Sequence, residues 1–398
     1  SLNKLSEIFE TESKISISKQ SLDEKLDADA VAFVKQILEL LVKEEITQRL
    51  RQANHLLEQF DSVRVKDSTC FKVSGNLSPF YQASSKETGK AIIKIQYEYD
   101  LRTGKIYDIS LHSYIDQDTS NAEESLEMVK LNDLIIRDLG YVTLKAMIGI
   151  MEKGAFFLNR FDMSSNAYED LTSDNKIDFG KVQSYMKKYG LHYIEKNVFI
   201  GDKQRIPVRM VIERLPESEI EKRLRKLERL ESRRNRKYSA QYRSCLELNV
   251  YVTNIPKESL AGEQISTIYR LRWQVEIVFK TWKSIGKVNL TRKMKKHRFD
   301  AMLYAKLIML CLFQMIFFSV NGMSMRYRNK ALSIYKTYKT LTNSLNKIKR
   351  SLCKGPYAIR KTLLVFIDLI SKKCILEKKK GSISSVEILY MEIQKYSI

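Results

Sequence analysis

The chain has 398 residues, enough for more than one hydrophobic core, and its 69 Lys and Arg against 47 Asp and Glu give a formal net charge of +22. This excess points to a polyanionic partner, nucleic acid before a membrane surface. Five scattered cysteines form no Cys-x-x-Cys pair and four histidines lie far apart, which argues against a disulfide framework, a zinc knuckle or a histidine-based metal site. The sequence also contains no phosphate-binding Walker loop.

Residues 1–60 are predicted to be helical, with an amphipathic run from Asp29 to Gln59. Such a run suits a packing helix or part of a DNA-binding region, and the pattern does not separate the two. We assign 1–60 to a helical N-terminal region that binds DNA.

Residues 61–162 are predicted to form three strands and then alternating helices and strands. The strands are expected at 63–73, 91–101, 105–114, 134–138 and 155–160, and the helices at 122–129 and 142–152. In the first strand, Asp67 lies on the apolar face, where a carboxylate is costly unless it is paired or binds a metal. The alternative is that Asp67 caps the strand end at a turn with Ser68 and Thr69.

A second candidate acid, Asp138, ends a short buried strand just before Gly140 and a predicted helix. Ligands of open α/β sheets bind outside the carboxyl ends of strands, so a site acid is expected there. A simple helix cap is the alternative. Asp133, at the opposite end of that strand, and Asp108, in an alternating strand, are weaker candidates.

Further along, strands are expected at 193–200, 206–214 and 245–253, with a very basic helix at 217–238 between the last two. Alternating charge up to Glu231 is typical of a solvated helix. The cations beyond it have no acidic compensation, so we predict that they contact DNA phosphates: Arg233, Arg234, Arg236 and Lys237.

The segment 269–283 reads YRLRWQVEIVFKTWK and is predicted to form one helix. At about 100° per residue, a polar stripe lies beside an apolar stripe that can pack inward. The polar stripe contains Tyr269, Arg272, Glu276, Lys280 and Lys283, and the apolar stripe Ile268, Leu271, Val275, Val278, Phe279 and Trp282. A carboxylate held among cations suits a metal-binding acid aimed at a polyanion, although a ladder of surface ion pairs would give a similar pattern.

A dense basic patch follows this segment, consisting of Lys287, Arg292, Lys293, Lys295, Lys296, His297 and Arg298. We predict that Arg292, Lys293, Lys295, Lys296 and Arg298 bind DNA. The apolar stretch 301–320 contains Lys306 and Gln314, which favours a buried core helix over a membrane span. Residues 321–398 interleave aromatics with cations, as nucleic-acid contacts and amphipathic helices both do. The residues after Gly381 are expected to form a last helix, for dimer contacts.

The spacing Tyr269-x2-Arg272-x3-Glu276-x6-Lys283 resembles the signature of DDE transposases of bacterial insertion sequences, in the insertion-sequence-four family. Asp67 followed by Ser68 and Thr69 resembles that family's first catalytic acid. Asp138 matches the second, although Leu139 follows where the family usually has a basic or small residue. The resemblance covers about 63–318.

The resemblance implies an α/β fold with a ribonuclease-H-like catalytic core, at 61–162 and 256–320, interrupted by a mainly β insertion domain at 163–255. Helical regions would lie at both ends, 1–60 and 321–398. In the family the insertion helps to hold the transposon end. Some relatives place a tryptophan before its last strand to stack on a displaced base, where this chain has Leu248 and Asn249.

The implied function is a cut-and-paste DNA transposase that cleaves the ends of an insertion sequence and joins the 3′-hydroxyls to target DNA. Asp67, Asp138 and Glu276 would be the catalytic acids and would bind two Mg²⁺ ions, which Mn²⁺ can replace, with Asp67 bridging both. Phosphates would be positioned by Tyr269, Arg272, Lys280 and Lys283.

The expected partner is double-stranded DNA, as terminal inverted repeats and as target, bound by a homodimer in the bacterial cytoplasm at the nucleoid, without a membrane. Three alternatives stay open: an inactive transposase-derived DNA-binding protein, a ribonuclease-H-fold nuclease without strand transfer, and a structural RNA-binding protein.

Overall fold

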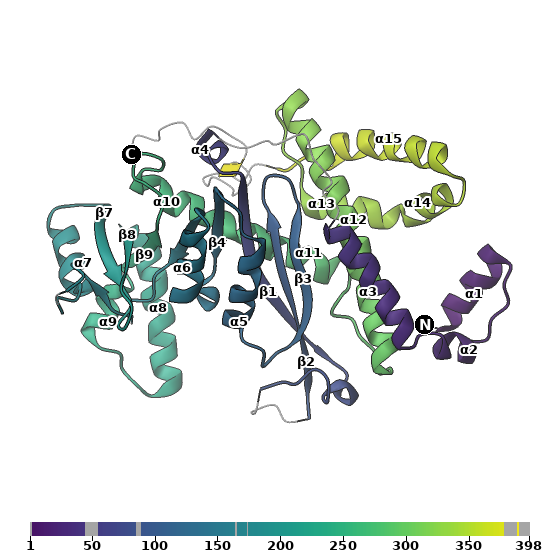
Figure 1. The fold of residues 1–398 in the computed structure, drawn as a ribbon, viewed down its shortest axis with the longest axis horizontal. Coiled ribbons are helices and arrows are strands. Elements are labelled where there is room, and N and C mark those ends of the chain that lie inside the picture. The colour runs from purple at the N-terminus through teal and green to yellow at the C-terminus, as the bar shows by residue number, and fades with distance from the viewer. Residues whose placement is uncertain are drawn as a thin grey trace. The chain divides into compact units, whose positions relative to one another are not determined.

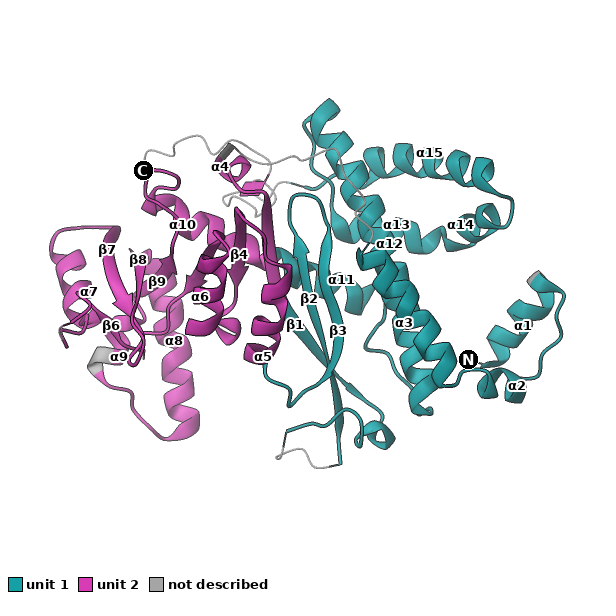
Figure 2. Cartoon of the chain, in the orientation of Figure 1, with its two compact units in different colours: residues 1–52, 67–117, 274–384 teal, residues 53–66, 118–273, 385–398 magenta. Residues whose placement is uncertain are grey.

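The computed structural model describes residues 2–43, 55–84, 89–163, 165–172, 174–377 and 388–389. Their contacts divide the chain into two compact units, each built from separated segments (Figure 2). Unit 1 comprises 1–52, 67–117 and 274–384, and unit 2 comprises 53–66, 118–273 and 385–398. These units cut across the five segments expected from the sequence.

The strands form a mixed sheet in the order β3-β2-β1-β4-β5-β9-β8-β7-β6 within the described residues. Figure 1 draws the strands as arrows and labels most of them. Their bounds are β1 (Ser62–Val73), β2 (Ala91–Asp100), β3 (Ile106–Ser113), β4 (Asp133–Arg137), β5 (Phe156–Arg160), β6 (Ala167–Tyr168), β7 (Tyr193–Ile200), β8 (Ile206–Arg214) and β9 (Leu248–Thr253). β4 runs parallel to β1 and β5, whereas β2 pairs antiparallel with β3, and β9, β8, β7 and β6 continue antiparallel from β5. The expected α/β class is confirmed.

Strand β1 is buried on both faces along its first half. Its alternating sequence predicts one solvated face, but the side chains of Arg64 and Lys66 are 0% exposed. Arg64 donates a hydrogen bond to the carbonyl oxygen of Met128 at 2.7 Å and lies 3.3 Å from the Asp133 carboxylate. A charged side chain with such partners can be buried, which the alternation of residue types does not reveal.

Unit 2 packs helices against the sheet around a core that includes Ile135 of β4, Phe157 of β5 and Met147 of a covering helix. Its helices are α4 (His55–Glu58), α5 (Asp118–Glu124), α6 (Leu144–Glu152), α7 (Phe179–Lys188), α8 (Glu217–Arg234), α9 (Ala240–Cys245) and α10 (Gly262–Tyr269). The helix expected at 122–129 is instead α5 followed by a 3-10 turn, η3 (Ser125–Met128).

The region 163–255 differs from the mainly β insertion that we expected. It contains α7, α8 and α9 as well as β6 to β9. Its last strand, β9, pairs with both β5 and β8, so its strands extend the sheet that contains β4 and β5.

Unit 1 is mainly helical apart from β2, β3 and the second half of β1. Its helices are α1 (Leu2–Ser13), α2 (Lys19–Glu24), α3 (Ala28–Lys43), α11 (Trp273–Ser284, from residue 274 on), α12 (Lys296–Arg328), α13 (Ile334–Asn343), α14 (Leu345–Leu352) and α15 (Pro356–Lys373). The 44–54 part of the expected amphipathic run, and the helix expected after Gly381 apart from 388–389, lie outside the described residues.

Helix α12 is the one described helix long and apolar enough to cross a membrane, and half of its most apolar window is buried. Its Gln314 is buried, accepts a hydrogen bond from the Tyr97 hydroxyl and donates one to the carbonyl oxygen of Gly104 at 2.9 Å. The Tyr97 ring in turn lies 4.7 Å from the Trp282 ring of α11. These contacts support the predicted core helix, because an amide satisfied inside the protein needs no other partner.

Candidate active site

Two of the three predicted acids line one cavity in unit 1. Asp67 of β1 and Glu276 of α11 face a cavity of about 620 Å³. The other lining residues are Ser68, Phe279, Lys280, Lys283 and Ser284. The cavity therefore combines two carboxylates with two lysine side chains, a composition suited to a metal ion and a phosphate.

Asp67 lies inside a strand and not at its end, because β1 continues to Val73. The alternative of a strand-end cap is therefore wrong, although the Asp67 carboxylate accepts a hydrogen bond from the backbone N–H of Ser68 at 2.8 Å. On the opposite wall, Lys283 donates to the carbonyl oxygen of Cys70 at 3.2 Å. This bond fixes the end of α11 to the strand that carries Asp67.

Asp138 follows directly after β4 in unit 2, at the carboxyl end of the strand. It occupies the cap position of the 3-10 turn η4 (Leu139–Tyr141), but its side chain makes no capping hydrogen bond. The next helix, α6, is capped by Thr143, whose hydroxyl accepts from the N–H of Ala146 at 3.0 Å. The helix-cap alternative is therefore wrong, and the Asp138 side chain is available for another role.

Two signature residues converge on this end of β4. The Nε of Arg272 lies 3.6 Å from the Asp138 carboxylate, and the Tyr269 hydroxyl donates to the carbonyl oxygen of Arg137 at 3.5 Å. Burial raises the pKa of Tyr269 to about 12, so the phenol stays a neutral donor at physiological pH. The Tyr269 ring also packs on the Tyr251 ring at 5.2 Å.

The signature is not one continuous α-helix, contrary to our prediction. The 3-10 turn η5 (Arg270–Arg272) separates α10, which ends at Tyr269, from α11, which carries Glu276. The predicted inward stripe is nevertheless confirmed, since all its members are buried: Ile268, Leu271, Val275, Val278, Phe279 and Trp282. Tyr269 and Arg272 thus belong to unit 2, and Glu276, Lys280 and Lys283 to unit 1.

The two weaker acid candidates have other surroundings. Asp133 is buried at the start of β4 and accepts hydrogen bonds from the Ser62 hydroxyl at 2.6 Å and the N–H of Lys130 at 2.9 Å. With its ion pair to Arg64, it is a structural carboxylate. Asp108 lies within β3, opposite Glu98 in the β2–β3 pairing.

The basic patch after α11 is partly neutralised by acids that we did not foresee. Lys295 and Arg298 lie 3.4 and 2.7 Å from the two carboxylate oxygens of Asp23, and Lys296 pairs with Asp300. Arg292 and Lys293 remain exposed. The pairing with Asp23 could not be read from local sequence, because Asp23 is 275 residues away from Arg298 in the chain.

The cations at the end of α8 are exposed, as the sequence suggested. The helix ends at Arg234 with Asn235 in a left-handed conformation, and Arg233, Arg234, Arg236 and Lys237 are all solvent-accessible. Among the described ion pairs none involves these four residues, which keeps them available for phosphates.

Sequence reasoning missed a pair of arginines in unit 2. Arg160, at the end of β5, and Arg223 of α8 each donate to the side-chain oxygen of Asn249 at 2.8 Å. The Asn249 amide nitrogen donates to Glu213 at 3.1 Å. Burial, and then the nearby charge of Arg160, lower the pKa of Arg223. The sequence offered one clue to this pair: Arg160 lies at the end of a predicted strand, the same kind of position that made Asp138 a candidate.

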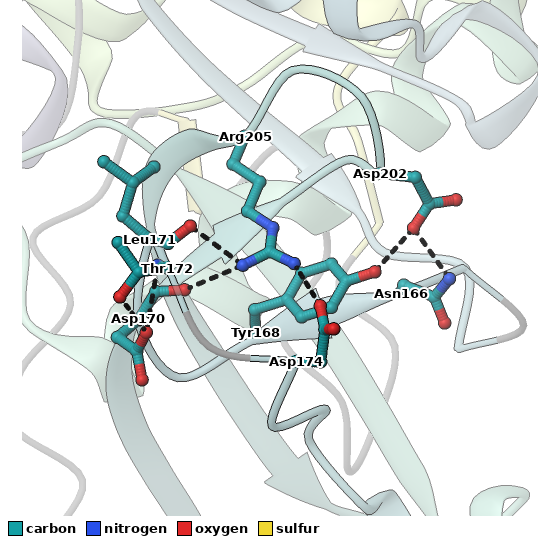
Figure 3. Close-up of polar contacts among 8 residues, drawn as sticks. All are labelled: Asn166, Tyr168, Asp170, Leu171, Thr172, Asp174, Asp202 and Arg205. Atoms are coloured by element: carbon teal, nitrogen blue, oxygen red, sulfur yellow. Dashed lines mark hydrogen bonds and ion pairs between the residues drawn. The ribbon is translucent and has the colours of Figure 1, made fainter.

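A second cluster of polar contacts, centred on Arg205 and Tyr168, links the segment before α7 to the turn between β7 and β8 (Figure 3). The Arg205 guanidinium stacks 3.7 Å from the centre of the Tyr168 ring, donates to the carbonyl oxygen of Leu171 at 2.8 Å and pairs with Asp174 at 3.0 Å. The Tyr168 hydroxyl donates to Asp202 at 2.7 Å. Because its charged members already have partners, we regard this group as structural.

No group of three or more His, Cys, Asp or Glu side chains arranged to hold a metal ion exists among the described residues. Within each unit, the donors near the predicted site are carboxylates: Asp67 and Glu276 in one, Asp138 in the other. Such oxygen donors suit Mg²⁺ or Mn²⁺ and not a soft metal.

Comparisons with known proteins identify the family. Residues 58–312 match the family model described as a transposase DDE domain. The transposase for insertion sequence element IS231F of Bacillus thuringiensis subsp. israelensis is 31% identical over 349 residues, 84% of this chain and 73% of that protein. The transposase for IS231B of subsp. berliner is 27% identical, covering 89% and 77% of the two chains.

A more distant relative, the transposase for element IS1151 of Clostridium perfringens, is 25% identical and covers 94% of this chain and 82% of that protein. A cryo-electron microscopy structure of a piggyBac transposase synaptic complex with hairpin DNA is 12% identical, with a TM-score of 0.43 over 93% of this chain and 67% of that one. Because the family model covers more than half of the sequence, this chain belongs to the DDE transposases, enzymes that cut DNA strands and join them to a new site.

Proposed function

We propose that this chain excises an insertion sequence and inserts it elsewhere through one active site formed by Asp67, Asp138 and Glu276. The observation that carries the proposal is the register of two parallel strands. Lys66 of β1 pairs with Arg137 of β4, and each is followed in the chain by one of the two aspartates. Glu276 lines the same cavity as Asp67.

The signature supports the same grouping through chain continuity. Arg272, which contacts Asp138, precedes Glu276 by one turn of backbone, across the junction of η5 and α11. Because Glu276 lies only four positions after Arg272, the segment that contacts Asp138 also supplies the third acid of the proposed site.

Divalent metal ions are used by DDE transposases. Here Asp67, Asp138 and Glu276 would hold two Mg²⁺ or Mn²⁺ ions, and the all-carboxylate donor set fits those ions. When bound, the ions supply activation of the attacking oxygen and stabilisation of the leaving oxygen.

The chain's own residues would position the substrate. Lys280 and Lys283, beside the two carboxylates, would hold the phosphates that flank the scissile bond. Tyr269 would remain protonated and donate a hydrogen bond, because its pKa is raised by burial. Arg272 would orient Asp138 and reach the DNA backbone from the same position.

The reaction consists of two phosphoryl transfers. In the first, water attacks the phosphorus at the element end, the bond to the 3′-oxygen breaks, and a free 3′-hydroxyl remains. In the second, that hydroxyl attacks a target phosphorus and displaces the target's 3′-oxygen, so the number of phosphodiester bonds is conserved. Both steps need the same acids.

The larger architecture is part of the proposal. We infer a ribonuclease-H-like core from the order β3-β2-β1-β4-β5 with β4 parallel to both neighbours. The region 163–255 and the N-terminal helices would bind the terminal repeats, and two copies would act together on two ends. Such a complex would work at the nucleoid.

The test uses a supercoiled plasmid that carries the complete element, incubated with purified protein and Mg²⁺, Mn²⁺ or EDTA. The parent chain should release the element and produce joined products only with a divalent ion. Asp67→Asn, Asp138→Asn and Glu276→Gln should each lose cleavage while still binding DNA. Glu258→Gln, at an exposed acid outside the site, is the matched control.

Each other result is informative. A fully active single variant removes that acid from the site. DNA binding without any cleavage by the parent favours a non-catalytic DNA-binding protein, and cleavage without joined products favours a nuclease.

A further inference from the structure

Much of the net positive charge of this chain comes from one stretch of its C-terminal half that contains no acidic residue. From Ala301 to Ile367 the sequence contains 12 Lys and Arg and no Asp or Glu. The formal charge of the whole chain is +22, so this stretch supplies more than half of it. None of the cations assigned above to the active site or to DNA contacts falls within it.

Helices α14 and α15 of unit 1 follow one another near the end of the described chain (Figure 1). They carry four of these cations at exposed positions, Lys347, Arg350, Arg360 and Lys361. On α14 and the following turn, Lys347, Arg350 and Lys354 are exposed and spaced three and four residues apart. The spacing of three puts Lys347 and Arg350 on one stripe of α14, and Lys354 follows in the turn just after the helix ends at Leu352. Arg360 and Lys361 follow on α15, one turn after Tyr357, whose side chain is 80% exposed.

These five cations differ from the exposed cations of this chain that have a carboxylate partner. On α8, Lys222 pairs with Glu219 and Arg225 lies 3.2 Å from Glu221. No described ion pair involves Lys347, Arg350, Lys354, Arg360 or Lys361. A surface of like charges without counterions costs self-repulsion, which a polyanion would relieve.

We infer that α14, α15 and the turn between them form a second DNA-binding surface, which grips the phosphate backbone of duplex DNA without reading its sequence. The contact would be electrostatic, made by Lys347, Arg350, Lys354, Arg360 and Lys361, with the Tyr357 ring against the sugar-phosphate backbone. This inference rests on the proposed function only in taking DNA as the substrate.

Duplex DNA is preferred to a membrane as the partner. A basic amphipathic helix can also lie on anionic lipid, and α15 exposes Leu364 and Val365. However, α14 and the turn expose three cations beside one large apolar residue, Leu352, and the chain belongs to a family that acts on DNA.

The experiment measures binding apart from catalysis. The full chain carrying Glu276→Gln is titrated into a fluorescein-labelled duplex of arbitrary sequence, in EDTA, over a series of NaCl concentrations. Lys347→Gln/Arg350→Gln/Lys354→Gln and, separately, Arg360→Gln/Lys361→Gln are compared with this parent. Lys145→Gln is the matched control, because that exposed cation pairs with Glu123 at 2.7 Å and lies outside every segment proposed to bind DNA.

Removing one cation that binds a phosphate should weaken binding about fivefold near physiological salt and reduce the slope of log K against log [NaCl] by about one. The control should keep the parent's affinity and slope. Equal affinity and slope in the parent and both test variants would overturn the inference. The same variants are also tested for binding to phosphatidylserine vesicles. If they lose vesicle binding while duplex binding is unchanged, the surface binds a membrane and the inference is wrong.

Two further measurements keep the result interpretable. Circular dichroism identifies a variant that has not folded, in which case the other variant decides. The plasmid assay, repeated without Glu276→Gln, identifies the DNA: normal cleavage with reduced joining indicates target DNA, and reduced cleavage indicates the element end or its flank. If the unmutated chain does not cleave the plasmid, the proposed function is rejected, but the binding comparison remains valid.

Discussion

The guanidinium of Arg272 lies 3.6 Å from the carboxylate of Asp138, where β4 ends and the chain turns toward α6. The Arg272 side chain is only 9% exposed, whereas that of Asp138 is 46% exposed. A nearly buried cation therefore holds an accessible carboxylate. Because the Arg272 side chain is nearly buried, this ion pair restricts the position of Asp138 more than an exposed pair of flexible side chains would.

Replacing Arg272 should affect both cleavage and binding. In Arg272→Ala, a misplaced Asp138 should slow single-turnover cleavage by about 10²-fold. End binding should also weaken, with the salt slope reduced by about one if Arg272 contacts a phosphate. Arg270→Ala, at the exposed neighbour, serves as the control. An unchanged cleavage rate in Arg272→Ala would show that Asp138 needs no such orientation.

Asp133 should be important for stability and not for chemistry. Asp133→Asn leaves the buried Arg64 without its carboxylate, which should lower the free energy of unfolding by about 3–5 kcal/mol. Urea denaturation measures the loss, and Asp108→Asn on β3 is the comparison. The folded fraction of Asp133→Asn should still cleave DNA, so complete inactivity of well-folded protein would make Asp133 a site acid instead.

Tyr269 should make the fold sensitive to alkali. Burial raises the pKa of this phenol to about 12, so the folded state favours its neutral form. This stabilisation is complete below the unfolded pKa near 10 and is lost as the pH rises toward 12. Its loss amounts to about 2–3 kcal/mol, because one pKa unit corresponds to about 1.4 kcal/mol.

The measurement is the free energy of unfolding of the parent and of Tyr269→Phe at increasing pH. Tyr269→Phe should show a shallower decline above pH of about 10. Tyr327→Phe, at a side chain 77% exposed, controls for the loss of a hydroxyl. Parallel curves for the parent and Tyr269→Phe would contradict the buried-phenol explanation.

The exposed end of α8 should contribute to DNA affinity without affecting the chemical step. Replacing Arg233, Arg234, Arg236 and Lys237 by Gln should weaken binding and reduce the salt slope by up to about four, one per phosphate contact. Cleavage at saturating protein should keep its rate. Binding that keeps the parent's slope would show that these cations face only solvent.

The sequence predicted the strands of the sheet well because their signals are local. The bounds expected at 193–200 and 206–214 agree with β7 and β8, and the strand expected at 134–138 is β4, shifted by one residue to 133–137. The buried stripe of α10 and α11 was also correct, since helical periodicity persists across a short 3-10 turn. Local patterns suffice wherever burial depends on neighbours in sequence.

Other features depended on contacts between distant segments. The burial of Arg64 requires Asp133, and the neutralisation of Arg298 requires Asp23. The 3-10 turn at Arg270–Arg272 contains no proline or glycine, the residues that usually indicate a helix break in a sequence. For the candidate site, residue types and spacing predicted three acids. The proposal that Asp67 and Asp138 act together needs the strand register, which the sequence alone does not give.

The contacts of Asn249 also show that the tryptophan of some related enzymes would not fit at this place in the chain. Its amide oxygen accepts from both Arg160 and Arg223, while the preceding Leu248 is completely buried. Grafting an indole side chain onto either position would remove the shared acceptor of two guanidinium groups or overfill a packed interior. Any aromatic platform for an unpaired base in this enzyme must therefore be engineered, or sought, somewhere else.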